Sequence, residues 1–337
     1  MTSLSVSLER YDDRLREEWL ALLPHQAAAA GAGKLDWKFR QNPAGDGLIS
    51  VARICGDVVG INAFMPVRFD GFGAPGLAGF QSMDTIVAPA ARGQGAFTRM
   101  VQAFQDAAPG DILYGFPNLS SSPGFFGKLG WTHLAPAPML ILPIRSGLFL
   151  KRLHPRMPDI ALPTFNGRSD RYADVEPISR FDARVDAVWG EFARTNGVRH
   201  GVQRDATFLN WRLFDHPVAR YSAATVGHRA YAAWCLEEKH GGRVGYIMDV
   251  FGDDMGVRTL VGYASARLKE LGADAVFAWN LPHMMSQHAY RAAGYWSLPD
   301  RLRPIRLNFG GRPLRSEIAD FNDLRRWHVS YLDSDTV

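Results

Sequence analysis

A short motif occurs twice in this chain, and this repeat constrains the fold more than any other feature of the sequence. Residues 35–43 (LDWKFRQNP) resemble residues 209–217 (LNWRLFDHP). Further along, Met83-Asp84 recurs as Met248-Asp249, and residues 128–131 (KLGW) recur as 292–295 (AAGY). Three pairs in the same order and at nearly equal spacing indicate that the chain is an internal duplication.

The two halves also predict similar secondary structure. In each half, β-branched runs typical of hairpin strands precede a strand, an amphipathic helix, a buried strand and a short helix that ends at glycine. The expected elements are 48–55, 58–68, 80–88, 94–107, 112–116 and 123–129 in the first half, and 231–237, 246–251, 257–271, 275–279 and 284–293 in the second. This order predicts an α/β fold with a mixed sheet in each half.

The length of 337 residues suits two domains of about 150 residues each. We expect a first domain at 1–145 and a second at 173–337, because residues 146–172 are rich in Pro, Arg and Gly and lack periodicity, as a linker would be. The alternating pattern of residues 327–332 predicts a final strand.

Composition excludes several classes of function. The net charge of +4 weakly favours an anionic ligand, but no Lys/Arg run is dense enough for a nucleic-acid surface. Cys55 and Cys235 lie outside any zinc-type spacing, so we expect no metal site and a reducing, cytoplasmic location. No apolar run of 18 residues is present, so we expect no membrane span. The sequence leaves the oligomeric state open.

Residues 85–97 (TIVAPAARGQGAF) form the segment with the clearest chemical meaning. An apolar strand leads into a glycine-containing loop, and the loop opens an amphipathic helix. Unpaired N–H groups and the positive end of the helix dipole make such a loop suitable for phosphate. Gly93 and Gly95 let a ligand approach the backbone closely, and Arg92 adds a positive charge.

This segment resembles the pyrophosphate-binding motif of GNAT acyltransferases, Arg/Gln-x-x-Gly-x-Gly/Ala, with Arg92 first and Gly95 fourth. Phe97 departs from the family pattern at the sixth position, where we expect it to leave the N–H groups of the loop in place but to crowd the start of the helix. Residues 117–131 (PNLSSSPGFFGKLGW) resemble a second GNAT signature, in which an Asn after the fifth strand, here Asn118, contacts the cofactor. The resemblance covers residues 45–135 clearly and 205–308 as a degenerate copy. It implies two tandem GNAT-like domains, each with a mixed, mostly antiparallel twisted sheet flanked by helices.

The resemblance further implies acetyl-CoA or another acyl-CoA as acyl donor, bound by the first domain. Its pantetheine arm would pair with Thr85, Ile86 and Val87 as an added strand, and an N–H near Ile86 or Val87 would polarise the thioester carbonyl. Its pyrophosphate would bind the loop formed by Arg92, Gly93, Gln94, Gly95, Ala96 and Phe97.

The family's general acid is a Tyr four residues before the glycine of the second signature, and this position holds Phe126 here. The second half has Tyr290 at that position, but it has Gly252-Asp253-Asp254-Met255-Gly256 in place of the phosphate loop. Two carboxylates there would repel a pyrophosphate. We therefore expect the second domain to have lost cofactor binding and to serve substrate binding or architecture.

Asp84 is the nearest ionisable residue to the expected thioester, which makes it the candidate general base, with Asp249 as its counterpart. Trp37, Arg40, Trp211 and Tyr290 are candidates for substrate contact. For the two tryptophans, equivalent core positions in the two copies are the stronger alternative.

These residues predict an N-acyltransferase that moves an acyl group from coenzyme A to the amine of a small molecule, such as an amino sugar. Two alternatives stay open at this stage. Phe97 and Phe126 favour a non-catalytic acyl-CoA-binding protein. A Fem-type transferase that takes aminoacyl groups from tRNA has a related tandem fold, but it would need a basic RNA-binding surface.

Overall fold

The computed structural model describes residues 4–23, 25–70, 76–148, 154, 156–164, 167–315 and 318–336. The chain forms two compact units, and each contains segments from distant parts of the sequence. Unit 1 comprises residues 1–136, 216–218 and 307–324. Unit 2 comprises residues 137–215, 219–306 and 325–337.

The sheet of unit 1 has the strand order β1-β2-β3-β4-β5-β15-β6. All of these neighbours are antiparallel except β4 and β5, which are parallel. The strands are β1 (Leu4–Arg10), β2 (Leu48–Ile54), β3 (Asp57–Asp70), β4 (Leu77–Val87), β5 (Ile112–Gly115), β6 (Thr132–Pro136) and β15 (Asn308–Pro313).

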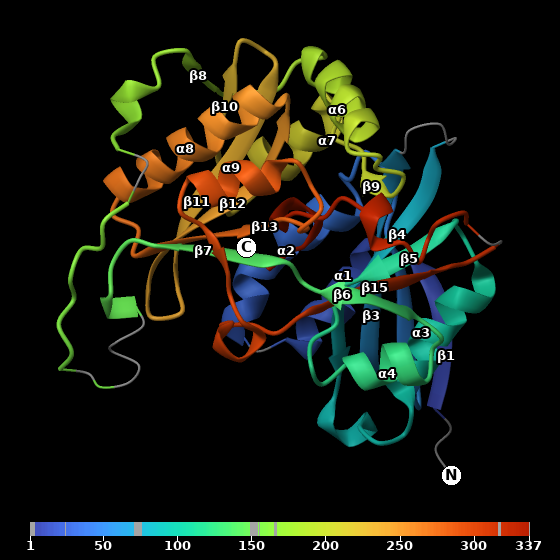
Figure 1. Cartoon of the computed structure of the whole chain (residues 1–337). Helices are drawn as coiled ribbons and strands as arrows, with labels where there is room; N and C mark the ends of the chain where they lie inside the picture. Colours follow the sequence, from blue (N-terminus) through green and yellow to red (C-terminus); the bar gives the residue numbers. More distant parts are fainter. Residues whose placement is uncertain are drawn as a thin grey trace. The chain divides into compact units, whose positions relative to one another are not determined.

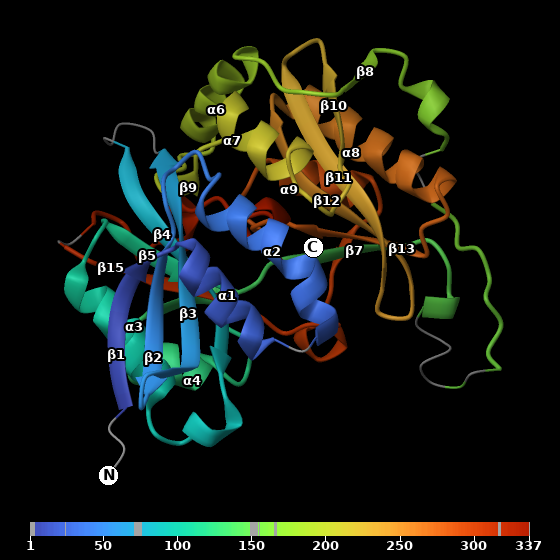
Figure 2. The same cartoon turned by 180° about the vertical axis from the view of Figure 1, so that it is seen from behind.

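Helices cover both faces of this sheet. On one face lie α3 (Ala96–Ala107) and α4 (Ser122–Gly127) (Figure 1). They pack Val101, Phe104 and Phe125 against strand residues such as Phe64 and Leu113. The other face carries α1 (Asp13–Leu22) and α2 (His25–Phe39), which lie in front of the strands in the reverse view (Figure 2). The turn η1 (Pro89–Ala91) links β4 to α3.

Unit 2 repeats this plan with the order β8-β10-β11-β12-β13-β7-β14. Its single parallel pair, β12 with β13, corresponds to β4 with β5. The strands are β7 (Met139–Pro143), β8 (Val175–Ile178), β10 (Ser222–Val226), β11 (Ala230–Lys239), β12 (Gly242–Gly252), β13 (Ala275–Trp279) and β14 (Trp296–Ser297).

One face of the unit 2 sheet packs against α8 (Asp254–Glu270) and α9 (Ser286–Ala292) (Figure 1). This face holds a core that includes Leu260, Val276 and Tyr290. The opposite face carries α6 (Arg184–Thr195), whose Trp189 contacts Phe251 of β12. The remaining short elements are β9 (Gly201–Val202), α7 (Ala206–Leu209), η2 (Ser169–Arg171), η3 (Asn210–Phe214), η4 (Asp300–Leu302), η5 (Leu324–Arg326) and η6 (Tyr331–Asp333).

Each sheet takes its sixth strand from an unexpected part of the chain. In unit 1 this position belongs to β15, which lies between β5 and β6, and in unit 2 it belongs to β7, which lies between β13 and β14. Unit 2 therefore starts at residue 137, and unit 1 includes 307–324. The expected boundaries at 145 and 173 do not describe these units, because hairpin and helix signals cannot show which sheet a single strand joins.

The repeated motifs occupy corresponding places in the two units. Trp37 and Trp211 lie at the end of α2 and in η3, while Asp84 and Asp249 lie in β4 and β12. The alternating tail is a correction to the sequence analysis: residues 327–330 form an irregular segment, followed by the helical turn η6, and no strand. None of the described helices is long and apolar enough to cross a membrane.

Candidate functional site

The strands β4 and β5 pair only over part of their length, and this leaves an exposed backbone edge. Their parallel register runs from Gly79 with Ile112 to Ser82 with Gly115, where β5 ends. The strand β4 continues to Val87, paired on its other side with β3. Among the described strands, none covers the β5-facing edge of Asp84–Val87, so Thr85, Ile86 and Val87 form an edge to which an extended ligand can add.

This edge begins at a β-bulge. Ala63 pairs with Met83 and Ile61 pairs with Ile86, so Asn62 alone lies opposite Asp84 and Thr85. Asp84 has a φ of +48°, which a non-glycine residue rarely adopts. A bulge bends the strand and changes which backbone groups face each edge.

Asp84, the candidate base, is ion-paired. Its Oδ2 lies 2.7 Å from Nζ of Lys38 in α2, and the Lys38 side chain is only 3% exposed while that of Asp84 is 27% exposed. Burial of an unpaired ammonium would be costly, so the pair satisfies Lys38 and fixes Asp84. The role of Asp84 as a base stays a prediction.

The loop after β4 has the backbone expected of an anion-binding turn. Gly93 and Gly95 have φ values of +77° and +76°, and a Cβ at either would meet no atom within 4 Å. Both glycines therefore face open space, and residues 92–95 are exposed. Side-chain bonds from Arg92 Nε to the Val87 carbonyl (3.4 Å) and from Gln94 Nε2 to the Ala90 carbonyl (2.9 Å) support the loop.

The helix α3 begins at Ala96 immediately after this loop, and no side chain caps it. The N–H groups of its first turn therefore remain available for an anion. Phe97, which the sequence places at a crowding position, instead directs its ring towards α4, where it meets Phe125 edge-on at 5.1 Å between centroids. The start of the helix is thus not blocked.

Asn118 lies three residues beyond the end of β5 and is exposed. Its Oδ1 accepts bonds from the N–H groups of Ser120 and Ser121, each at 3.0 Å. No acceptor for its Nδ2 lies among the described residues. The amide can therefore donate to a ligand while its carbonyl holds the turn, which is compatible with the predicted cofactor contact.

Phe126, which the resemblance to GNAT acyltransferases places where that family has its general acid, lies in α4. Its ring packs beside His133 of β6 at 4.9 Å between centroids. His133 Nε2 in turn lies 3.1 Å from Oδ1 of Asn308 on β15. The aromatic ring fills the position without a proton to donate.

The corresponding helix start in unit 2 is closed to an anion. Asp253 caps α8 by accepting from the N–H of Gly256 at 2.6 Å, and it also pairs with Arg229 at 2.9 Å. Asp254 adds a second carboxylate in the first turn. The helix dipole and N–H groups are thus satisfied by the protein itself.

The C-terminal segment, residues 325–336, covers β12 and β13 of unit 2 on the face that carries α6. Tyr331 stacks on Trp279 of β13 at 4.6 Å and meets Tyr246 of β12 at 5.3 Å. His328 lies beside Trp189 of α6 at 5.2 Å. This segment therefore occupies the sheet face that carries Asp249, the counterpart of Asp84.

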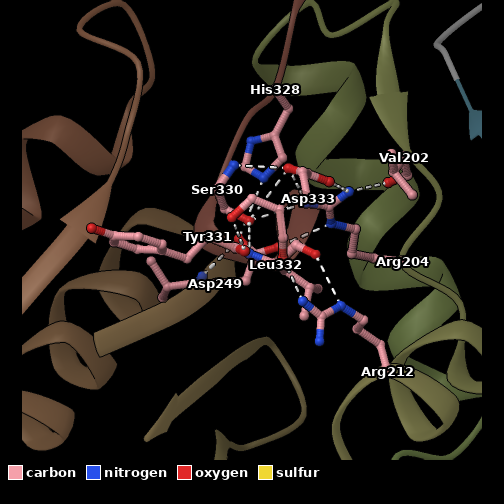
Figure 3. A network of polar contacts seen from close by, with 11 residues as sticks. Val202, Arg204, Arg212, Asp249, His328, Ser330, Tyr331, Leu332 and Asp333 are labelled. Atoms are coloured by element: carbon pink, nitrogen blue, oxygen red, sulfur yellow. Dashed lines mark hydrogen bonds and ion pairs between the residues drawn. The ribbon is translucent and has the colours of Figure 1, made fainter. Parts of the chain in front are cut away.

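A buried ionic network anchors this segment (Figure 3). Arg204, which is fully buried, donates to Asp249 Oδ2 at 2.9 Å and to Asp333 Oδ2 at 2.8 Å. His328 Nε2 lies 3.3 Å from Asp249 Oδ1. Arg212 donates to the carbonyls of Leu332 and Ser334 at 3.2 and 2.5 Å. Asp249 is committed to this network, which favours a structural role over that of a base.

Three of the four candidates for substrate contact are buried. Trp37, Trp211 and Tyr290 are 2%, 5% and 2% exposed. Their burial favours core packing: Trp37 meets His216 at 4.3 Å and Tyr290 meets Tyr295 at 5.1 Å. Burial also raises the pKa of Tyr290 well above its usual value, which makes it a poor acid. Arg40 is 43% exposed and pairs with Asp13 at 2.7 Å.

Sequence reasoning missed Lys38 and Asn62, which both contact the bulge. Lys38 stands inside the repeated motif beside Trp37, and Asn62 is the one amide in the apolar run Val58–Val67. A lone amide in a buried strand needs a hydrogen-bond partner. The position of Asn62 in an apolar run was therefore the sequence signal that could have identified it. The described residues contain no cluster of His, Cys, Asp or Glu that could hold a metal ion.

The sequence matches no protein-family model and no curated protein. Solved structures, however, share its fold at low sequence identity. A GCN5-related N-acetyltransferase from Kribbella flavida superposes with a TM-score of 0.59 at 12% identity, over 92% of this chain and 72% of that one. A tandem GNAT protein from the clavulanic acid biosynthesis pathway gives 0.53 at 15% identity, over 93% and 100%.

The N-myristoyltransferase of Saccharomyces cerevisiae, solved with bound myristoyl-CoA, gives a TM-score of 0.54 at 11% identity, over 91% of this chain and 82% of that one. The chain therefore has the GNAT fold. More particularly, it has the tandem form of that fold, with two mixed sheets flanked by helices, as the internal repeat predicted.

Proposed function

We propose that this protein is an acyl-CoA-dependent N-acyltransferase whose donor site lies in unit 1. The observation that carries the proposal is the continuous run from the free edge of β4 through an exposed glycine loop to the uncapped start of α3. The edge suits an amide-containing arm, and the loop suits a pyrophosphate. The GNAT and N-myristoyltransferase structures of the same fold support acyl-CoA as the donor.

Each part of the run has a distinct task. Thr85, Ile86 and Val87 would hold the pantetheine arm through main-chain bonds. The N–H groups of residues 93–97, with Arg92, would hold the pyrophosphate. Asn118 Nδ2 would add a side-chain bond at the carboxyl end of β5. A backbone N–H near Ile86 or Val87 would stabilise negative charge on the thioester oxygen.

In the reaction, the nitrogen of a neutral amine attacks the thioester carbonyl. The C–N bond forms and the C–S bond breaks, which releases an amide and the thiolate of coenzyme A. Asp84 is the proposed acceptor of the proton that the amine nitrogen must lose as the amide forms. Since Phe126 cannot protonate the thiolate, the leaving group departs as the anion or takes its proton from water, which its ordinary pKa of about 8.5 allows.

We propose a small-molecule amine as acceptor, with an amino sugar as the first class to screen and acetyl-CoA as the first donor. The similarity to a tandem GNAT protein from the clavulanic acid biosynthesis pathway supports a small-molecule acceptor. Use of acyl-CoA, together with two unbonded cysteines, supports the cytoplasm as the location.

Phe126 supports one alternative, a protein that binds acyl-CoA without turning it over. Its ring packs in place of a proton donor. Binding of acyl-CoA with no acyl transfer to any amine would favour this second function.

The test is calorimetric titration of the full chain with acetyl-CoA and longer acyl-CoAs. The decisive variant is Gly95→Glu, which puts a carboxylate at the phosphate loop. The matched control is Gly56→Glu, because Gly56 also has a positive φ of +92° and open space around it but lies in the β2–β3 turn. We expect one equivalent to bind wild type and Gly56→Glu, and Gly95→Glu to lose at least about tenfold in affinity by charge repulsion. If wild type binds no acyl-CoA, or Gly95→Glu binds as well as wild type, the proposed donor site is wrong.

A further inference from the structure

Asn62 lies at the centre of a hydrogen-bonded arrangement around the bulge in β4. Its side chain is completely buried. Nδ2 donates to Ser82 Oγ at 3.2 Å, and Oδ1 accepts from the hydroxyl of Thr85. Ser82 is the last residue of β4 that pairs with β5, and Thr85 is the first residue after the bulged Asp84. One side chain therefore joins both ends of the bulge.

The bulge needs such support because its backbone is strained. A left-handed conformation is unfavourable for a non-glycine residue, and such residues persist only where their surroundings fix them. Asp84 is fixed on its other side by the buried ammonium of Lys38. The bulge is thus held from β3 by Asn62 and from α2 by Lys38.

The bulge decides which N–H groups reach the free edge of β4. Successive residues of a strand direct their backbone groups alternately to the two neighbouring strands, so one inserted residue inverts the alternation beyond it. Beyond Asp84, Ile86 and Val87 pair with Ile61 and Gly60 in the shifted register. Without the bulge, the opposite set of N–H groups would face the thioester carbonyl.

We propose that Asn62 is a positioning residue that holds the bulge so that a backbone N–H after Asp84 points at the carbonyl of the bound thioester. This inference rests on the proposed function. It goes beyond donor binding, because Asn62 is buried behind the edge and acts through Ser82 and Thr85. Loss of Asn62 should therefore impair carbonyl polarisation more than it impairs acyl-CoA affinity.

Isotope-edited infrared spectroscopy of acetyl-CoA labelled with carbon-13 at its carbonyl tests this without knowledge of the acceptor. A hydrogen bond lowers the carbonyl stretching frequency. We expect a lowered frequency on wild type, and a return towards the free value on Asn62→Ala, with an affinity within about threefold of wild type. Once an acceptor is known, kcat should fall by about 10²-fold, since loss of one oxyanion donor has that order of effect, with KM for acyl-CoA nearly unchanged.

Two further variants complete the experiment. Ser50→Ala is the control, because Ser50 is opposite Asn62 on β2, is fully buried, and its hydroxyl has no partner among the described residues. It should keep the lowered frequency. Thr85→Val removes one bond of Asn62 at an exposed, sterically similar position, so it serves if Asn62→Ala does not fold, and it should also raise the frequency.

The outcomes separate the inference from the proposed function. If wild type binds no acetyl-CoA, the proposed function fails and the inference falls with it. If wild type binds acetyl-CoA but its carbonyl frequency equals the free value, or if the variants keep the lowered frequency, the donor site stands and the role of Asn62 is overturned.

Discussion

At the scale of single residues, the two copies of the Met-Asp pair show how one position can take two roles. Asp84 is partly exposed next to a free strand edge and pairs with Lys38. Asp249 is buried among Arg204, His328 and the C-terminal segment. Burial disfavours the charged form of Asp249, but Arg204 and His328 more than offset it and hold its pKa below the ordinary value of 3.8.

This lowered pKa predicts acid sensitivity. A carboxyl group whose pKa is lower in the folded state adds stability above the unfolded pKa, and this is lost as the pH falls through about 4 towards the folded pKa. We expect the free energy of unfolding of unit 2 to fall between pH 6 and pH 3, as measured by denaturant titration. Asp249→Asn should cost about 3–5 kcal/mol at pH 7, because it leaves Arg204 short of one partner, and should flatten the acid dependence.

The control for this prediction is Asp174→Asn, which alters an exposed carboxylate of the same unit. Its unfolding curves should stay close to those of wild type at each pH. An Asp249→Asn variant that keeps both the stability at pH 7 and the acid dependence of wild type would contradict the importance of the network.

At the scale of elements, the helix starts that follow β4 and β12 differ between the two units. The start of α3 has glycines, open space and no cap, whereas α8 is capped by Asp253. The C-terminal segment adds to the difference, because it covers the face of the unit 2 sheet that carries Asp249.

The C-terminal segment should be a large contributor to the stability of unit 2. Tyr331 is 3% exposed and contacts aromatic rings of both β12 and β13. We expect Tyr331→Ala to destabilise the unit by about 3–5 kcal/mol, the usual cost of deleting a buried aromatic side chain. Thermal and denaturant unfolding would measure this.

Trp296→Ala is the matched comparison, because Trp296 is an aromatic residue of β14 in the same unit that is 46% exposed. It should change the free energy of unfolding by no more than about 0.5 kcal/mol. Equal effects of the two substitutions would show that the tail packs only loosely.

At the scale of the whole molecule, the strands β7 and β15 make the two units depend on the complete chain. A fragment of residues 1–145 contains β5 and β6 but lacks β15, which lies between them. It would also expose β7, whose buried Leu140 and Leu142 belong to the core of unit 2.

We therefore expect the 1–145 fragment to fail as an independent domain. Circular dichroism should show no cooperative unfolding, and amide exchange of β5 should be fast, because its edge towards β15 is unpaired. The full chain is the control and should unfold cooperatively. A fragment with native-like protection and acyl-CoA binding would show that the sixth strand is dispensable.

The sequence by itself determined the duplication, most of the helices and strands from residue 48 to 129 and from 231 to 293, and the glycine loop. These are local properties: periodicity, turn residues and the spacing of Arg92, Gly93 and Gly95 report on a few neighbouring residues. Phe97 was misjudged as crowding, because the direction of its ring depends on α4.

Only the tertiary structure decided the rest. The segment Asn308–Pro313 contains two glycines and a proline, so its composition does not favour a strand. The segment is nevertheless a strand, because it fills the place between β5 and β6. Glycine is needed there, because a Cβ at Gly310 would lie only 2.5 Å from the Thr132 carbonyl oxygen. The tail alternates like a strand, yet the rings of Trp279 and Tyr246 and the charge of Arg204 bind it as an irregular segment. Pairing of distant residues is set by which groups remain unsatisfied after the local elements form, and no short stretch of sequence contains that information.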